Sequence, residues 1–446
     1  MNHRRSLARF GAGSVVPFAA VVLCFAAAGP VDPERVSIGN LDAVPDGRSY
    51  EGSVSGNGRY VAFYSAASNL LPGAGNDQDD IFVRDRKKRT TTLASPNIVD
   101  GGEGNEVSRF PAISGNGRFV LYYSIASDLV AGDAEGYWDV FLTDMKTGQV
   151  TRLSEDEAGV GGDELSYIWG ASISKNGRYM VFYSGAANLV GVGNDQNGHT
   201  DVFLHDRVKG TTTLISRNAA GDSANDESYD PSMSPNGRYV AYYSRASDLV
   251  ADDPTANRYD IYVYDTKRRT TEIVPLATVL DPPDNDSSDP VISDNGRYVA
   301  FWSSATNLVG TDDTNYQDDV FLVDRKTGET KRLSVANDGT EADNGSYYPA
   351  MSASGKVVVF YSLASTLDGA DANGQSEDVF RYDVKKGVLT LISKTAAGTG
   401  GDAQSYAWGA CLSSNGKYVV FASDASNFDS EGAVGTDDTF VLKLGK

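Results

Sequence analysis

The stretch SPNGRYVAYYS, residues 234–244, decides the fold because the chain contains seven close variants of it. The seven copies begin at Ser55, Ser114, Ser174, Ser234, Ser293, Ser352 and Ser413. Successive copies start 59, 60, 60, 59, 59 and 61 residues apart, and such a constant period is typical of repeat architectures. We therefore expect one closed structure spanning residues 34–446, and not several unrelated domains.

Each repeat unit contains four short runs rich in Val, Ile, Phe and Tyr, separated by Asn-Gly and basic turns. In the fourth unit these runs are residues 229–234, 238–244, 260–265 and 270–275. Their length and composition predict four antiparallel strands, the content of one propeller blade. The second run is apolar at nearly every position, as expected for a strand covered on both faces. The fold class predicted is an all-β, single seven-bladed β-propeller.

The two ends of the repeat predict how the ring closes. The last unit stops after its third strand, at residues 439–444, and lacks a fourth. The segment ERVSIGN, residues 34–40, aligns with the fourth strands of other units, and Ser37 precedes Ser55 by the 18 residues that separate Ser216 from Ser234. The N-terminal strand 34–40 is therefore predicted to complete the seventh blade and to cover the sheet edges of an open array.

The unit SxNGRYVAFYS followed by DVFLxDxKTGxTTRLS resembles the TolB-like, PD40 class of WD40-like β-propeller repeats, over nearly the whole chain after residue 34. The resemblance implies the propeller fold, and it implies no particular activity because propellers host many functions. Compared with TolB, the chain has no room for an N-terminal α/β domain, has seven units instead of six, and has longer loops. A part in a Tol-Pal-like envelope complex is one role that the resemblance suggests.

Residues 1–28 have the pattern of a secretory signal peptide. Three arginines precede an apolar stretch, and Ala26-Ala27-Ala28 precedes Gly29. The apolar stretch is too short for a membrane anchor, so we expect a periplasmic or secreted chain without a membrane span. Cys24 would leave with the signal peptide, and Cys411 would then have no cysteine with which to form an intrachain disulfide.

The chain is acidic, with 60 Asp and Glu against 39 Lys and Arg and a formal charge of −21. Removing residues 1–28 takes away three of these basic residues, so the remaining chain is more acidic still. Nucleic acid and anionic membranes are therefore not expected as partners. The chain is expected to be a monomer. Strand order places the NGR-type turns on one face and the long loops before the third strands, which are rich in Asp and Asn, on the opposite, acidic face.

Two of the acidic loops suggest calcium. Asp195, Asn197 and Asp201 in one loop, and Asp371, Asn373 and Asp378 in another, supply the hard oxygens that Ca²⁺ prefers. Neither loop has the terminal glutamate spacing of an EF-hand. The alternative is that these residues cap turns through hydrogen bonds to their own backbone. No cofactor is expected apart from such structural calcium.

The acidic face also gathers aromatic residues where the first strands enter the central channel. Units three and seven share SYxWGA there, two residues longer than the other units. Aromatic rings beside carboxylates and amides suit a carbohydrate or a protein ligand. The alternative interpretation is packing between blades. The candidate ligand-binding residues are Tyr50, Arg109 with the adjacent Phe110, Tyr167, Trp169, Tyr229, Tyr347, Tyr348, Tyr406 and Trp408.

The sequence favours a binding or scaffold protein over an enzyme. After residue 28 only His199 and His205 remain, and no GxSxG nucleophile motif is present. No catalytic residue is therefore assigned. The second hypothesis is a polysaccharide-active enzyme, a glycoside hydrolase or lyase, that uses carboxylates and tyrosines at the same channel mouth.

Overall fold

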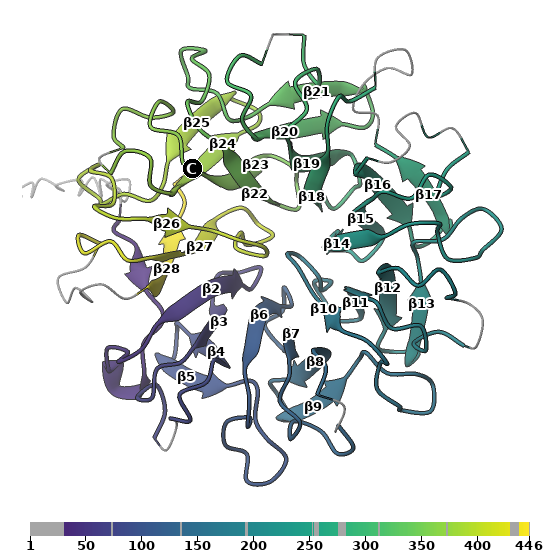
Figure 1. The fold of residues 1–446 in the computed structure, drawn as a ribbon. Coiled ribbons are helices and arrows are strands. Elements are labelled where there is room, and N and C mark those ends of the chain that lie inside the picture. Colours follow the sequence, from purple (N-terminus) through teal and green to yellow (C-terminus); the bar gives the residue numbers. More distant parts are fainter. Residues whose placement is uncertain are drawn as a thin grey trace, which may run out of the picture.

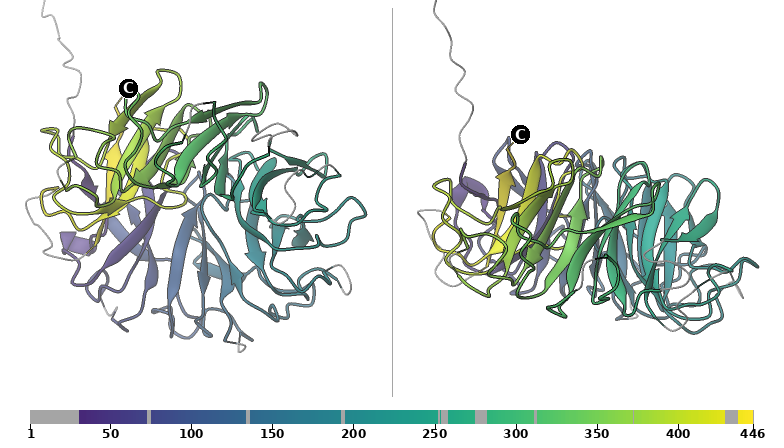
Figure 2. Two further views of the ribbon diagram at one scale, coloured as in Figure 1. Left: turned by 45° about the horizontal axis from the view of Figure 1, so that its top comes forward. Right: turned by 90° about the horizontal axis from the view of Figure 1, so that it is seen from above.

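The computed structural model describes residues 31–72, 75–133, 136–191, 195–251, 253, 258–274, 282–310, 313–371, 373–428 and 437–445. These residues form seven four-stranded antiparallel sheets arranged in a ring around a central channel (Figure 1). Seen from the side, the ring is a shallow disc (Figure 2). The predicted seven-bladed propeller is confirmed. The expected signal peptide, residues 1–28, lies outside the described residues.

Blades 1 to 6 each use four consecutive strands, ordered from the channel outward. The strands are β2 (Ser49–Val54), β3 (Tyr60–Ser65), β4 (Asp80–Asp85) and β5 (Thr90–Leu93) in blade 1; β6 (Ser108–Ile113), β7 (Phe119–Ser124), β8 (Asp139–Asp144) and β9 (Gln149–Arg152) in blade 2; β10 (Ser166–Tyr167), β11 (Tyr179–Ser184), β12 (Asp201–Asp206) and β13 (Thr211–Leu214) in blade 3; β14 (Ser228–Met233), β15 (Tyr239–Ser244), β16 (Asp260–Asp265) and β17 (Thr270–Ile273) in blade 4; β18 (Ser287–Ile292), β19 (Tyr298–Ser303), β20 (Asp319–Asp324) and β21 (Glu329–Arg332) in blade 5; and β22 (Ser346–Met351), β23 (Val357–Ser362), β24 (Asp378–Asp383) and β25 (Val388–Leu391) in blade 6.

Blade 7 joins the two ends of the chain. Its strands are β26 (Ser405–Tyr406), β27 (Tyr418–Ser423), β28 (Asp438–Lys443) and, as the outer strand, β1 (Glu34–Arg35). Arg35 lies opposite Phe440, and the Ser37 hydroxyl donates a hydrogen bond of 2.8 Å to Asp438 Oδ1. The predicted closure by the N-terminal strand is confirmed, with a shorter strand than residues 34–40 because the backbone turns into the 3₁₀ helix η1 (Asn40–Asp42). None of the helices in the described ranges has the length and apolar character that a membrane crossing requires.

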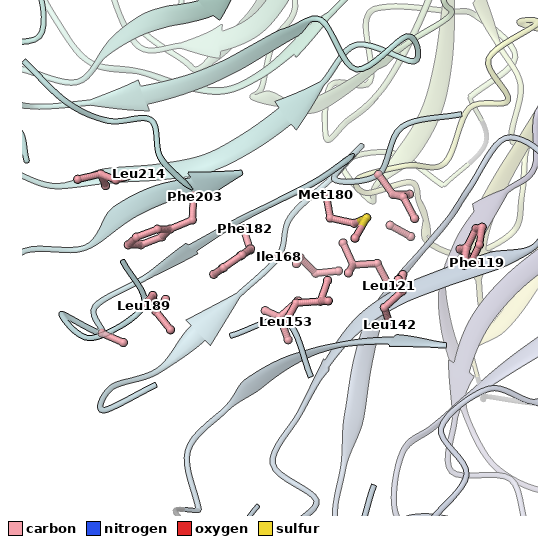
Figure 3. Packing of buried hydrophobic residues seen from close by; sticks show 14 of the residues in the cluster. Phe119, Leu121, Leu142, Leu153, Ile168, Met180, Phe182, Leu189, Phe203 and Leu214 are labelled. Carbon is pink, nitrogen blue, oxygen red and sulfur yellow. The ribbon is translucent and has the colours of Figure 1, made fainter. Parts of the chain in front are cut away.

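The core consists of layers between neighbouring blades. In each blade one aromatic residue of the second strand stacks on one of the third, as Phe182 does on Phe203 with ring centroids 5.5 Å apart. Figure 3 shows the layer between blades 2 and 3, where Leu121 of β7 lies beside Met180 of β11, and Phe119 and Phe182 belong to the same cluster. Burying such a side chain contributes about 1.5–3 kcal/mol, which explains why the second-strand phrase recurs almost unchanged.

An aspartate begins the third strand of every blade and holds the fourth strand. These aspartates are buried, with 0–3% of their surface exposed. In six blades a serine hydroxyl of the following strand segment donates to the aspartate, through Ser95 to Asp80, Ser154 to Asp139, Ser216 to Asp201, Ser334 to Asp319, Ser393 to Asp378 and Ser37 to Asp438. In these six blades the aspartate therefore links the third strand to the segment of the fourth strand.

The arginines of the NGR turns form ion pairs within their own blades. In blades 1 to 5 each one pairs with the aspartate that ends its third strand, as Arg297 does with Asp324 at 2.5 Å. The guanidinium also lies over the ring of the following aromatic residue, 4.9 Å from the ring centre of Tyr298 in this case. Their charge is therefore largely neutralised within the blade.

Candidate ligand site at the channel mouth

Two loops from nearly opposite blades meet across the channel. They follow β10 and β26, carry the SYxWGA sequence, and reach the middle of the ring in Figure 1. A Cβ atom added at Gly409 would lie 3.1 Å from Gly170 Cα, and both glycines have positive φ angles of 62° and 57°. The backbones can approach this closely because neither residue has a side chain. The two extra residues noted in the sequence therefore serve to span the channel.

On the side of the NGR turns, the channel below these loops forms a narrow hollow. Its lining includes Val54, Ile113, Ile173, Met233, Ile292 and Met351. These side chains are apolar and come from the inner strands or the segments that follow them. The polar and aromatic groups are gathered on the other side, at the acidic face.

The first strands of five blades contain a bulge where they enter the channel. The register shifts between Arg109 and Ala112 in blade 2, for example, and at the corresponding places in blades 1, 4, 5 and 6. A bulge redirects the side chain of the extra residue. In blades 2, 4, 5 and 6 this residue has a positive φ angle and precedes a proline; the four are Phe110, Asp230, Asp289 and Tyr348.

Four aromatic residues form a cluster over the channel, which we call the mouth cluster: Phe110, Trp169, Tyr348 and Trp408. The ring centroids of Phe110 and Trp169 are 5.0 Å apart, those of Trp169 and Tyr348 are 5.4 Å apart, and those of Tyr348 and Trp408 are 6.0 Å apart. The four residues come from blades 2, 3, 6 and 7, and each is partly exposed. The cluster therefore combines ring-to-ring packing with an accessible aromatic surface.

Two carboxyl groups lie at the bulges of blades 4 and 5. Tyr243 donates a hydrogen bond of 3.1 Å to Asp230 Oδ2, and the Trp302 indole donates one of 2.5 Å to Asp289 Oδ2. Burial raises the pKa of Asp230 to about 6. Burial, followed by repulsion from Asp230, holds the pKa of Asp289 well above its usual range. The pair therefore keeps a proton at a pH where exposed aspartates are ionised.

The structure brings three of the predicted site residues, Trp169, Tyr348 and Trp408, together in the mouth cluster. The other six occupy the strand position just outside it, in register with the second strand: Tyr50 opposite Tyr64, Arg109 opposite Tyr123, Tyr167 opposite Tyr183, Tyr229 opposite Tyr243, Tyr347 opposite Tyr361, and Tyr406 opposite Ala422. Five of these six are partly exposed, and Tyr406 is buried at 9% exposure.

Carboxylates accompany these outer positions. Arg109 forms an ion pair of 2.6 Å with Asp79, and the Tyr229 hydroxyl donates to Glu227 Oε2 at 2.9 Å. Asp318 interacts with the Tyr347 hydroxyl, and burial raises the pKa of this carboxyl group. The predicted combination of aromatic rings with neighbouring acids is therefore present around the mouth.

The sequence interpretation missed Asp230 and Asp289. A signal was available, because both precede a proline at the bulge position where blades 2 and 6 have Phe110 and Tyr348. The aligned repeats thus contain an acid where an aromatic residue is found elsewhere. Only the ring geometry shows that the two acids come from neighbouring blades and interact.

Histidine does not line the mouth. His199 lies in the loop before β12, with Nδ1 4.0 Å from Asp226 Oδ1. His205 lies within β12 and contacts the Thr212 hydroxyl at 3.1 Å, and burial lowers its pKa. Neither described histidine belongs to the mouth cluster; His199 instead lies close enough to Asp226 and Glu227 for the three side chains to share an ion.

No family model matches the chain, and no curated protein matches its sequence. Among solved structures it is similar to an oligogalacturonate lyase from Vibrio parahaemolyticus, at 11% identity and a TM-score of 0.53, over 94% of this chain and 97% of that one. It is also similar to an oligogalacturonate lyase in complex with manganese, at 12% identity and a TM-score of 0.52, over 94% of this chain and 99% of that one. For TolB from Acinetobacter baumannii the identity is 13% and the TM-score is 0.41, over 82% of this chain and 65% of TolB. At such identities the similarity shows the β-propeller fold alone.

Proposed function

We propose that this chain is an exported, non-catalytic binding protein whose ligand docks at the channel mouth on the acidic face. The observation that carries the proposal is the partly exposed mouth cluster with carboxyl groups beside it. Aromatic faces pack on the CH groups of sugar rings, and neighbouring acids accept hydrogen bonds from hydroxyl or amino groups. A carbohydrate is therefore the first ligand class.

The charge of the mouth narrows this class. Asp79, Glu227 and Asp318 surround the outer tyrosines and Arg109, and Asp230 lies at the channel itself. These groups repel anionic sugars such as polyuronates and favour neutral or amino sugars. A protein segment is the alternative ligand, because Tyr and Trp are also enriched in protein interfaces.

A glycan array probed with the purified chain, followed by calorimetric titration of the glycans that bind, tests the proposal. We expect Trp408→Ala to weaken binding about 10-fold or more, because an aromatic contact contributes roughly 0.5–1.5 kcal/mol beyond its buried area. Tyr316→Ala is the matched control, since Tyr316 is 78% exposed on a loop before the third strand of blade 5.

Two results would contradict this proposal. Absence of any bound glycan would favour the protein alternative. Equal affinity of Trp408→Ala and Tyr316→Ala would show that the mouth cluster is packing only. If Trp408→Ala does not fold, Trp169→Ala provides the same comparison.

A polysaccharide-active enzyme at the same mouth is the second candidate, favoured by the Asp230–Asp289 pair. A carboxyl group that keeps its proton near neutral pH can act as a general acid beside an ionised partner. Incubation of array-positive glycans with the chain, with assays for reducing ends and for unsaturated products, decides between the candidates. If the unmodified chain turns the glycan over and Asp289→Asn does not, the protein is an enzyme and the binding-only proposal is wrong. If the unmodified chain shows no turnover, the enzyme hypothesis is wrong.

A further inference from the structure

One position in the fourth strand differs between blades in a way that the fold does not require. It lies directly opposite the buried aromatic residue of the third strand, as Arg332 lies opposite Phe321. Blades 2, 5 and 7 have an arginine at this position, whereas the other four have an aliphatic residue. The seven residues are Leu93, Arg152, Leu214, Ile273, Arg332, Leu391 and Arg35.

In blades 2 and 5 the guanidinium of this arginine lies between two buried carboxyl groups. In blade 5 Arg332 lies 3.1 Å from Asp319 and 3.9 Å from Asp313, and it also pairs with Glu341. In blade 2 Arg152 lies 3.3 Å from Asp133 and 3.6 Å from Asp139. In each case one carboxylate begins the third strand and the other precedes it by six residues. The arginine therefore supplies the positive charge that these buried pairs need.

Blade 6 has a corresponding pair of carboxyl groups, seven residues apart instead of six, and no arginine. Asp378 begins β24, Asp371 lies in the preceding loop, and their carboxyl groups interact directly. The residue opposite Phe380 is Leu391, which is fully buried and cannot neutralise them. A pair of acids is thus present where blades 2 and 5 have a pair of acids and a cation.

Three side-chain oxygens at this place accept no hydrogen bond from the described part of the chain. They are Asp371 Oδ2, Asn373 Oδ1 and Asp378 Oδ2, and all three are inaccessible to solvent. Asp378 is only 1% exposed, so its free oxygen lies well inside the protein. The other atoms of these groups are satisfied, since Asp371 Oδ1 accepts from the backbone of Asn373 and Asp378 Oδ1 accepts from Ser393. Buried oxygens without donors are costly unless a cation binds them.

Blade 3 repeats the arrangement in part. Asp195 and Asp201 interact, Leu214 replaces the arginine, and Asp195 Oδ2 is buried without a donor among the described residues. In this blade Asn197 Oδ1 accepts a hydrogen bond from the backbone of His199, and Asp201 Oδ2 accepts one from Asn197 Nδ2, so two fewer oxygens are free than in blade 6. A weaker version of the blade 6 site is therefore present.

Blades 1 and 4 lack the features that define the site. In blade 1 the residue six positions before Asp80 is Ala74, so the second acid is missing. In blade 4 the Tyr262 hydroxyl donates a hydrogen bond of 2.7 Å to Asp253, which satisfies the second acid. Asp139 Oδ2 in blade 2 and Asp319 Oδ2 in blade 5 are also buried without a hydrogen bond, but each belongs to an aspartate that forms an ion pair with the arginine of its blade. Among the described residues, blades 3 and 6 are thus the ones that combine an interacting pair of acids, an aliphatic residue in the fourth strand and a buried acid oxygen without a donor.

We propose that blade 6 binds a Ca²⁺ ion through Asp371, Asn373 and Asp378, in the place that an arginine occupies in blades 2 and 5, and that blade 3 binds a second ion more weakly. The donor set consists of carboxylate and amide oxygens, which suits a hard cation and not zinc or copper. Ca²⁺ suits it better than Mg²⁺, because Ca²⁺ accepts irregular sets of protein oxygens whereas Mg²⁺ retains an octahedral water shell. This inference is independent of the ligand proposed at the mouth.

Thermal melting and calorimetric titration of the purified full chain, first stripped with a chelator, test the proposal. We expect Ca²⁺ at 100-fold excess over its Kd to raise the melting temperature by about 3–5 °C. Asp371→Asn is expected to lower the affinity of the stronger site at least 10-fold, and Asp195→Asn to remove the weaker site. Glu157→Gln is the matched control, because it removes one exposed negative charge elsewhere and should leave the shift unchanged.

Exchanging the arginine between blades gives a second measurement. Leu391→Arg copies blade 5 into blade 6 and should abolish binding at the stronger site. Arg332→Leu should create a new Ca²⁺-dependent shift through Asp313, Asp319 and Glu341, which lie close enough to share one ion. Absence of any Ca²⁺ binding by the unmodified chain would overturn the proposal, as would equal affinity in the unmodified chain and Asp371→Asn. If Leu391→Arg does not fold, Asp371→Asn alone decides.

Discussion

At the scale of single residues, one backbone position carries different chemistry in different blades. The bulge residues Phe110, Asp230, Asp289 and Tyr348 share positive φ angles of 44–53° and a following proline, yet two are aromatic and two are acidic. Such a backbone conformation is unfavourable for non-glycine residues and is found mainly where the surrounding structure holds it for a function. The repeat therefore provides a fixed frame at the channel, and individual side chains give it different chemical properties.

The Asp230–Asp289 pair predicts an unusual pH dependence for Asp289→Asn. Because the pKa of Asp230 is raised from 3.8 to about 6 in the folded state, its protonated form is favoured by folding, and this stability is lost as the pH rises through that window. Asparagine in place of Asp289 can still accept the Trp302 hydrogen bond and removes the repulsion. As the pH rises from 4 to 8, we expect the free energy of unfolding of the variant to increase by about 1–2 kcal/mol relative to that of the unmodified chain.

Melting temperatures of both proteins across this pH range check the prediction. Asp222→Asn serves as the control, because Asp222 is exposed and its replacement removes the same charged group. A difference between Asp289→Asn and the unmodified chain that stays constant with pH would show that the two carboxyl groups titrate independently of folding.

At the scale of elements, the strands that build the core are nearly the same in every blade, whereas the segments at the candidate sites differ between blades. The second strands are nearly identical because each is covered by two neighbouring blades, and any change of volume there is costly. The segments after the first strands vary, since only blades 3 and 7 have the loops that meet at Gly170 and Gly409. The fourth strands vary at the position of Arg332 and Leu391, which lies near two acids, one in the loop before the third strand and one at the start of that strand. The function is therefore expected where the elements differ.

At the scale of the whole molecule, the N-terminal strand closes the ring, and we expect stability to depend on this closure. Only two residues of β1 pair with β28, but Val36 next to them is fully buried and packs with Val54, Val61, Val420 and Val441. This cluster joins blade 7 to blade 1. The ends of the chain are thus joined by a small apolar contact and by the hydrogen bond from Ser37 to Asp438.

Val36→Asp is expected to open the ring, because it places a carboxyl group without a partner in an apolar cluster. A cost of about 3 kcal/mol or more is typical of an unpaired buried charge. Thermal melting together with limited proteolysis near the N-terminus measures the effect. The matched control is Val31→Asp, since Val31 is 49% exposed. Identical melting curves for the two variants would show that the propeller does not depend on this closure.

The sequence by itself determined the repeat, the number of blades, the closing strand and the general location of the aromatic residues. Each of these follows from local patterns: the spacing of the NGR turns, the apolar second strands and the 18-residue offset of Ser37. The tertiary structure alone decided which residues meet. Asp230 and Asp289 are 59 positions apart in the sequence, and Trp169 and Tyr348 are farther apart still, so their contacts depend on the curvature of the ring and on the loops that span it. For the cation site the sequence named the two loops and their oxygen-bearing residues, and the structure alone shows which of these oxygens are buried without a donor, because that depends on all of their neighbours.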